Sequence, residues 1–325
     1  TTEAERVIVD IVRGVACIPG TIHVVDGFPR IFPPKHDTFI TNLDDLPMPA
    51  WDKLLLDRYE KIASPHGVDM TPHGHRYAPM MTSRGCPFQC TYCHISMERF
   101  GRGDLTGNLG DLRLKSVQRV LREIDKLESL GVRKIWIEDD SLLAKKERIR
   151  EIFTAIKERG LIIGDVNGVN LVHFFIKSLG GLVPDREYME LLFDAGFKQI
   201  VFPVESGSQR ILDKYATGKL NLETLDIVSL MRTATEIGIV APVNIMLGFP
   251  DETEQEMEMS IELAQRLIDA GAPYVTFFLP IPFPGSTLYQ IAIDGGHLRE
   301  DFDPDTMNWK NGVLENTTVP RSRIL

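Results

Sequence analysis

The sequence is poor in cysteine, with only Cys17, Cys86, Cys90 and Cys93 among its 325 residues. Three of the four lie within eight residues of one another, whereas the disulfide framework of a secreted protein spreads its pairs along the chain. The spacing therefore argues against a disulfide-stapled domain and favours a metal site in a reducing compartment. We predict a helix over residues 3–18 and, after it, a hairpin with its turn at Asp26-Gly27. We interpret the remote Cys17, which lies on this predicted helix with apolar neighbours, as a buried thiol.

The sequence also lacks a long apolar run and a basic run. Charges or prolines interrupt every apolar stretch before it reaches the length of a membrane span, and no signal-peptide pattern opens the sequence. We therefore expect a cytoplasmic protein without a membrane span. The 36 basic and 46 acidic residues give a net charge of −10, which disfavours the grasp of phosphate backbones and makes nucleic acid an unexpected partner.

What the sequence does contain is a repeated alternation of strand and helix. Apolar strands are predicted at residues 78–83, 132–137, 161–166, 199–204, 243–247 and 274–279. Helical periodicity lies between them, and Gly131, Gly160 and Gly196 stand where three of the helices should stop. The strands are short and continuously apolar, which is typical of a parallel α/β sheet covered on both faces. Periodicity alone leaves open whether the sheet closes into a barrel.

The cysteine trio, Cys86-Pro-Phe-Gln-Cys90-Thr-Tyr-Cys93, follows the first of these strands directly. Ligands of such folds bind beyond the carboxyl ends of the strands, so the trio stands where chemistry is expected. Four-iron clusters are ordinarily held by four cysteines. Three thiolates would leave one iron open to a small molecule.

A zinc site is the alternative interpretation of the trio. Zinc sites usually combine two Cys-x-x-Cys pairs or added histidines, and His94, next to Cys93, is a candidate fourth ligand. The observed spacing on a strand-to-helix loop makes zinc less favoured. A non-catalytic scaffold stabilised by zinc or by a cluster remains the alternative function.

Cys86-x-x-x-Cys90-x-Tyr92-Cys93, with an aromatic residue before the last cysteine, resembles the signature of the radical S-adenosylmethionine (SAM) superfamily. The resemblance implies a partial six-stranded parallel (β/α)6 TIM-like barrel with a 4Fe-4S cluster on Cys86, Cys90 and Cys93. It implies reductive cleavage of SAM to a 5′-deoxyadenosyl radical that attacks an unactivated carbon of a small-molecule substrate. It also implies an electron donor such as flavodoxin or ferredoxin.

The same resemblance suggests which residues hold the SAM cofactor, although no catalytic side chain is predicted. Glu138-Asp139-Asp140 stands in place of the usual Gly-Gly-Glu after the second strand, which makes Asp139 or Asp140 the candidate for the SAM amino group. The other candidates are Phe88, Tyr92, Glu205 and Asn244. A solvated acidic strand end is the plainer interpretation of the two aspartates. A helix start capped by Ser206 or Ser208 is the plainer interpretation near Glu205.

Other polar residues carry less weight. Arg84 is either a carboxylate partner or a surface arginine. The histidines that precede the first strand, His66, His73 and His75, are best interpreted as part of a solvated loop. Asn167, Asn170 and His173 follow the third strand, where a substrate would lie.

The connector at residues 44–52, Asp-Asp-Leu-Pro-Met-Pro-Ala-Trp-Asp, resembles the linker of the cobalamin-dependent class, which includes methyltransferases and anaerobic porphyrin cyclases. The resemblance implies three parts: residues 1–50 as the tail of a cobalamin-binding domain plus linker, residues 51–295 as the radical SAM core, and residues 296–325 as the start of a C-terminal extension. We expect the cobalamin-binding half upstream, and weak or no cobalamin binding by this chain alone.

Overall fold

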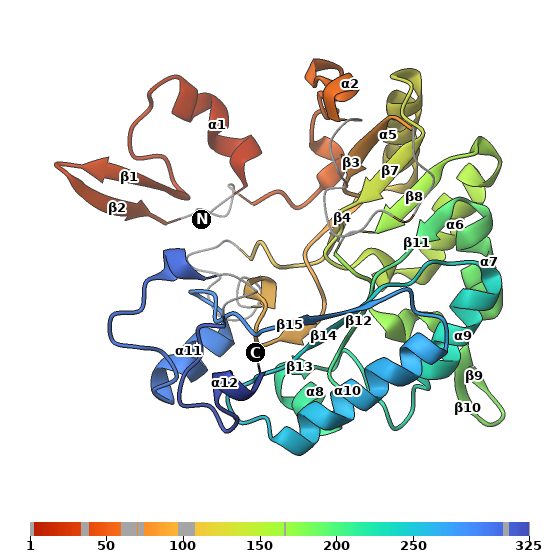
Figure 1. Ribbon diagram of the computed structural model, residues 1–325. Coiled ribbons are helices and arrows are strands. Elements are labelled where there is room, and N and C mark those ends of the chain that lie inside the picture. Colours follow the sequence, from red (N-terminus) through yellow and green to blue (C-terminus); the bar gives the residue numbers. More distant parts are fainter. Residues whose placement is uncertain are drawn as a thin grey trace.

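Parallel strands form the centre of the protein, as the alternation in the sequence predicts. The computed structural model describes residues 3–33, 39–59, 70, 75–96, 108–165, 167–307 and 312–324. One sheet contains β3 (Tyr77–Met80), β7 (Lys134–Ile137), β8 (Ile162–Asp165) and β11 (Phe197–Gln199) in this spatial order. A second contains β12 (Phe202–Glu205), β14 (Val243–Met246) and β15 (Val275–Phe278). Each strand pairs in parallel with its neighbour (Figure 1).

The predicted fourth strand is divided into β11 and β12. Between them the backbone N–H of Val201 donates to the side-chain carboxylate of Asp165 in β8 at 3.2 Å rather than to a backbone carbonyl, and Pro203 within β12 has no N–H to donate. Counting the two pieces together confirms six strands in chain order. Among the described residues β3 and β15 pair with no further strand, so the barrel is open between them.

Helices cover the outer side of the strands (Figure 1). They are α5 (Val117–Ser129), α6 (Lys146–Ile156), α7 (Arg186–Asp194), α8 (Gln209–Tyr215), α9 (Ile227–Ile237) and α10 (Glu254–Asp269). Their apolar stripes form the core with the strands: Phe153 of α6, for example, stacks on Phe197 of β11 with ring centroids 5.5 Å apart. The helix α11 (Thr287–Asp294) lies apart from the strands (Figure 1), and its Leu288 belongs to a separate buried cluster with Tyr215 and Phe249. Gly196 ends α7 with φ 106°, and a Cβ there would lie 2.1 Å from the oxygen of Leu161, so this position requires glycine.

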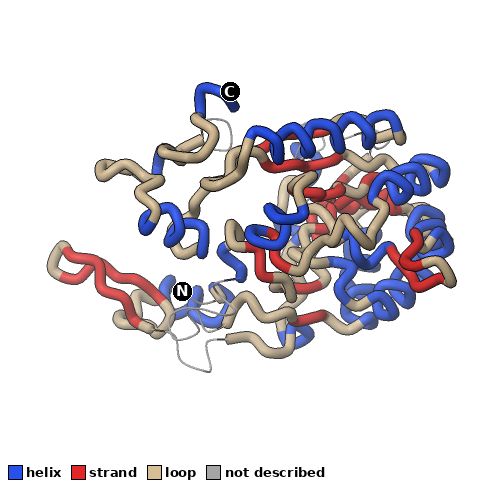
Figure 2. The backbone as a smooth tube through the Cα atoms, turned by 90° about the horizontal axis from the view of Figure 1, so that it is seen from below, coloured by secondary structure: helices blue, strands red, loops and turns tan. Residues whose placement is uncertain are grey.

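The N-terminal lobe, residues 3–33, contains α1 (Ala4–Val12) and a hairpin of β1 (Thr21–Val25) and β2 (Phe28–Phe32). The hairpin confirms the sequence prediction and projects from the rest of the protein (Figure 2). The predicted helix over residues 3–18 is too long, because α1 ends at Val12. Cys17 therefore lies outside the helix with φ 60°, and it is exposed rather than buried.

The proline-containing connector is bound to the barrel. The buried Arg119 donates to the carbonyl oxygens of Leu46 at 2.7 Å and Pro47 at 2.9 Å, and Asp44 accepts from the backbone N–H of Ser116 at 2.9 Å. The indole of Trp51 donates to the oxygen of Pro79 at 3.2 Å. The connector is thus a fixed part of the fold.

The other elements are short. They are the 3-10 turns at Leu43–Asp45, Trp51–Lys53, Leu142–Ala144, Lys157–Arg159, Leu171–Phe174 and Pro304–Thr306, the helices α2 (Leu56–Tyr59) and α12 (Arg321–Ile324), and a hairpin of β9 (Phe175–Ser178) and β10 (Gly181–Pro184) that was not predicted. In the described part of the chain, no helix combines the length and the apolar character needed to cross a membrane.

Candidate functional site

Two short antiparallel pairings hold the cysteine loop, residues 83–93. At its start β4 (Ser83–Arg84) pairs with β6 (Arg113–Leu114), and in its middle β5 (Gln89–Cys90) pairs with β13 (Ala216–Thr217). The backbone N–H of Cys86 also donates to the oxygen of Gly110 at 3.1 Å. The loop is thus supported by segments that lie far from it in the sequence.

Gly85 allows the sharp entry into this loop. Its φ is 81°, and a Cβ built there would lie 2.3 Å from the backbone oxygen of Asp111. Any other residue would have to adopt a left-handed backbone and displace the supporting segment. Glycine immediately before Cys86 is therefore a requirement of the loop geometry.

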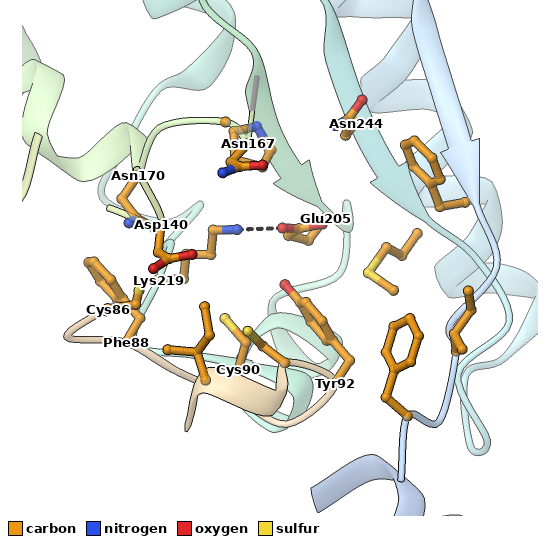
Figure 3. Close-up of a pocket in the computed structure, with 18 of the residues that line it drawn as sticks. Cys86, Phe88, Cys90, Tyr92, Asp140, Asn167, Asn170, Glu205, Lys219 and Asn244 are labelled. Carbon is orange, nitrogen blue, oxygen red and sulfur yellow. Dashed lines mark hydrogen bonds and ion pairs between the residues drawn. The ribbon is translucent and has the colours of Figure 1, made fainter. Parts of the chain in front are cut away.

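The three thiols of the loop line one cavity of about 360 Å³ (Figure 3). Cys90 is buried, whereas Cys86 and Cys93 are partly exposed. Burial raises the pKa of all three thiols, and that of Cys93 to about 11. The metal-free thiols thus hold their protons near neutrality, and binding of a metal would release them.

The two neighbouring aspartates after β7 have different surroundings. Asp139 is fully buried and accepts hydrogen bonds from the backbone N–H of Thr82 at 2.5 Å, the hydroxyl of Thr82 at 2.6 Å and the hydroxyl of Ser83 at 2.5 Å. It does not line the cavity. Asp140 does line the cavity, accepts from the N–H of Gly85 at 2.9 Å, and has a pKa raised by burial. The structure thus brings Asp140, and not Asp139, to the cysteines.

Glu205 and Lys219 form a largely buried ion pair in the same cavity (Figure 3). Burial opposes the charge of Lys219, but the carboxylate of Glu205 and the thiols of Cys90 and Cys86 hold its pKa above the ordinary value. Glu205 adopts φ 67° at the end of β12, a backbone that non-glycine residues rarely adopt and that occurs preferentially at functional sites.

Aromatic residues border the cysteines. Tyr92 lines the cavity, and its buried hydroxyl has no hydrogen-bond partner among the described residues. Its ring lies 6.1 Å from that of Phe249, which stacks on Tyr215 at 4.2 Å. Phe88 also lines the cavity, and its ring meets that of His173 edge-on with the ring centroids 6.1 Å apart. Both aromatic residues predicted from the sequence therefore reach the site.

Asn244 of β14 lies on the opposite side of the cavity (Figure 3), and Met246 of the same strand also lines the cavity. The strand leads into the turn at Gly248, where Glu252 accepts from the backbone N–H groups of Gly248 at 2.7 Å and Phe249 at 3.1 Å. Burial raises the pKa of Glu252 to about 7. Glu252 thus fixes the exit of β14 without lining the cavity itself.

The cavity also contains residues that the sequence did not single out or weighted lightly. Lys219 was missed: it lies fourteen positions after Glu205 and reaches the site only because β13 pairs with the cysteine loop. Asn167 and Asn170 line the cavity, where their side chains donate to the oxygen of Glu138 and to the hydroxyl of Ser141, both at 2.9 Å.

Other candidates lie elsewhere. Arg84 is an ion-pair partner of Glu3 and Glu5 and does not line the cavity. His75 and His94 are exposed and do not line it either. His66 and His73 lie outside the described residues.

The donor set fits an iron–sulfur cluster. Within the described ranges, no three His, Cys, Asp or Glu side chains converge closely enough to hold a single metal ion. A four-iron cluster spreads its thiolate ligands over several irons, so the thiols of Cys86, Cys90 and Cys93 need not meet at one point. The cavity beside them, with Asp140 and Lys219 in its wall, leaves room for a charged small molecule next to such a cluster.

The chain is similar in sequence and in fold to several known proteins. The sequence profile of the radical SAM superfamily matches residues 80–264. An uncharacterized methyltransferase from Pyrococcus horikoshii is 31% identical over 299 residues, which are 92% of this chain and 56% of that protein. Cytidylyl-2-hydroxyethylphosphonate methyltransferase from Streptomyces wedmorensis is 29% identical over 282 residues, which are 84% of this chain and 47% of that protein.

Among solved structures, the radical SAM methyltransferase TsrM from Kitasatospora setae, with cobalamin and a 4Fe-4S cluster bound, matches with a TM-score of 0.60. The identity is 15%, and the match covers 92% of this chain and 54% of that one. This similarity shows a shared fold. The chain spans about half the length of these relatives.

Proposed function

Because this chain belongs to the radical SAM superfamily, we propose that it cleaves SAM reductively to methionine and a 5′-deoxyadenosyl radical. Cys86, Cys90 and Cys93 would hold the 4Fe-4S cluster, which when bound and reduced supplies the electron for the cleavage. The observation that carries the proposal is that these three thiols share one cavity with charged side chains of both signs.

The cavity supplies partners for each polar part of SAM. Asp140 would accept from the ammonium group, because its carboxylate makes only one hydrogen bond to the loop. Lys219 would pair with the carboxylate while Glu205 stays beside it, and Asn244 and Met246 of β14 would flank the nucleoside. Phe88 and Tyr92 would exclude water from the cluster side.

For the whole protein we propose cobalamin-dependent methylation or cyclisation at an unactivated carbon of a small molecule, with flavodoxin or ferredoxin as electron donor. The methyltransferase names of the two relatives and the cobalamin in TsrM support this class. So does the N-terminal lobe, where Ile22, Val24 and Phe28 are exposed by 57%, 74% and 73%. Such an apolar surface is typical of a face that another domain covers. We retain residues 1–50, 51–295 and 296–325 as the proposed parts.

Anaerobic reconstitution with iron and sulfide tests the cleavage proposal. We expect a four-iron complement, an EPR signal of the reduced cluster that changes when SAM is added, and 5′-deoxyadenosine in the product chromatogram. Cys90→Ala should abolish the product with an unchanged far-UV circular dichroism spectrum, whereas the matched Cys17→Ala variant should retain it. Stoichiometric zinc with no SAM cleavage would instead favour the scaffold function.

Titration with hydroxocobalamin tests the proposed parts. We expect little or no change in the cobalamin absorbance spectrum with this chain alone. Tight binding would show that the cobalamin site is contained within residues 1–325, and the assignment of residues 1–50 as only a tail would then be wrong.

A further inference from the structure

A largely buried ion-pair cluster connects the N-terminal lobe to the cysteine loop. The carboxylate of Glu3 accepts from Arg84 at 2.6 Å and from Arg113 at 2.7 Å. It also accepts from the backbone N–H of Ile40 at 2.7 Å. The side chains of Glu3, Arg84 and Arg113 are only 6%, 25% and 7% exposed. One carboxylate thus joins two arginines and a backbone amide away from water.

Both arginines belong to the framework that supports the cysteines. Arg84 stands opposite Arg113 in the pairing of β4 and β6, and it lies two residues before Cys86. Arg113 also donates to the oxygens of Leu109 at 2.9 Å and Asp111 at 3.2 Å. These residues flank Gly110, whose oxygen accepts from the N–H of Cys86. Glu3 therefore holds both strands that position the first cysteine.

The second acidic residue of this lobe provides a matched comparison. Glu5 pairs with Arg84 as well, but its side chain is 37% exposed and an exposed charge is well solvated without its partner. Loss of the Glu3 charge, by contrast, would leave the buried Arg113 facing a neutral group. The two glutamates thus differ in burial and in whether they reach β6.

We propose that Glu3 is a positioning residue for the cluster site: from outside the barrel it holds the start of the cysteine loop through Arg84 and Arg113, so that the N-terminal lobe controls the position of Cys86 relative to the other two thiols. The role in cluster uptake rests on the proposed function. The positioning itself does not, because it concerns the loop before any cluster binds. A displacement of the lobe would reach Cys86 through Arg84.

Metal-free protein allows a direct test. Glu3→Gln and Glu5→Gln are compared by hydrogen exchange and by the rate of cysteine alkylation, both read by mass spectrometry. We expect Glu3→Gln to increase the alkylation rate of Cys86 by about threefold or more, since local opening governs access to a held thiol. Exchange should rise at residues 83–93 and 109–114 and stay unchanged in β8 and β12. Cys17, which is exposed, serves as the internal reference, and Glu5→Gln should resemble the parent protein.

Equal alkylation and exchange in Glu3→Gln and the parent protein would overturn the proposal, as would equal effects of the two glutamine variants. If Glu3→Gln loses protection throughout the barrel, Arg84→Lys decides, because it keeps the charge but removes the guanidinium that joins Glu3 and Glu5. In Arg84→Lys, a loss of exchange protection that is confined to residues 83–93 supports the proposal, and any other result overturns it. Failure of the parent protein to bind a cluster would refute the proposed function while leaving this comparison valid.

Discussion

Neighbouring residues in this site have different structural roles. Asp139 accepts three hydrogen bonds from Thr82 and Ser83 and faces away from the cavity. Asp140, one position later, is at the cavity wall, where among the described residues it accepts one hydrogen bond, from Gly85. One carboxylate therefore supports the loop, and the other is available to a ligand.

We predict that Asp140→Asn weakens SAM binding by about tenfold, or about 1.4 kcal/mol, because an amide no longer pairs with the ammonium group. Iron content should stay close to that of the parent protein, since the thiols and the acceptor for Gly85 remain. Isothermal titration with SAM and iron analysis measure the two quantities.

The matched Asp139→Asn variant should instead keep its SAM affinity and lose stability. It loses charge-assisted hydrogen bonds to Thr82 and Ser83, so the free energy of unfolding should fall by about 2 kcal/mol. Equal loss of SAM affinity and iron in Asp140→Asn would contradict the assignment.

The Glu205–Lys219 pair allows stability to be separated from binding. Lys219→Met leaves the buried Glu205 without a cation, which we expect to lower the free energy of unfolding by about 3–5 kcal/mol. The double variant Glu205→Gln/Lys219→Met should recover most of that stability, because neither buried charge remains. Urea denaturation measures the effect.

SAM affinity should not recover in the double variant, since the proposed partner of the SAM carboxylate is still missing. Recovery of stability and affinity together would show that Lys219 serves the fold alone.

At the scale of elements, the cysteine loop depends on its glycine. Gly85→Ala places a Cβ 2.3 Å from the oxygen of Asp111, whereas Gly160, with φ 65°, has open space around the same position. Both substitutions incur the left-handed backbone cost of about 1–2 kcal/mol. Only Gly85→Ala should also lower iron uptake on reconstitution, because it displaces the segment that holds Cys86. Similar iron uptake in both variants would contradict this role for the loop.

The stability of the region where β8, β11 and β12 meet should depend on pH through Asp165. This carboxylate accepts from the N–H groups of Gly168 and Val201, and burial raises its pKa from 3.8 to about 7. The folded protein thus keeps a proton that the unfolded chain has lost, so the contribution of Asp165 to stability falls as pH rises from about 4 to about 7.

Relative to Asp165→Asn, the parent protein should lose stability over this interval by at most about 1.4 kcal/mol per pH unit. Urea unfolding of both proteins at several pH values measures the difference. A difference that is constant with pH would show that Asp165 titrates at its ordinary value, and one that grows in favour of the parent protein as pH rises would show a lowered pKa; either result would contradict the prediction.

At the scale of the whole molecule, the cavity is built from both sheets and the cysteine loop. Asp140 follows β7 of one sheet, Glu205 and Asn244 belong to β12 and β14 of the other, and Lys219 follows β13. A ligand that contacts all of them should hold the open barrel together.

We therefore predict that SAM raises the melting temperature of the cluster-loaded protein, with about 2.7 kcal/mol of stabilisation at a concentration one hundred times the Kd. Adenosine at the same concentration should have little effect, because it lacks the groups that pair with Asp140 and Lys219. Anaerobic differential scanning fluorimetry measures both. Equal shifts with the two ligands would place the binding energy in the nucleoside.

The sequence alone determined the family and the fold class. Cys86, Cys90 and Cys93 are local in the chain, so their spacing by itself was enough to propose them as the cluster ligands, and the apolar strands indicate burial on both faces in the same way. Phe88, Tyr92, Asp140, Glu205 and Asn244 could be predicted because each lies in the loop, on a strand or just after one. The sequence also predicted the hairpin of the N-terminal lobe from its Asp26-Gly27 turn.

Tertiary structure decided what depends on contacts between distant segments. Lys219 reaches the cavity through the pairing of β13 with β5, and Arg84 is directed to Glu3, eighty-one positions away. The path of the backbone after β7 places the neighbouring Asp139 and Asp140 in different surroundings. Cys17 is exposed because α1 ends before it. Local sequence patterns indicate which residues are buried and how the ligands are spaced. The partner of a charged side chain, by contrast, depends on which distant segment of the chain folds against it.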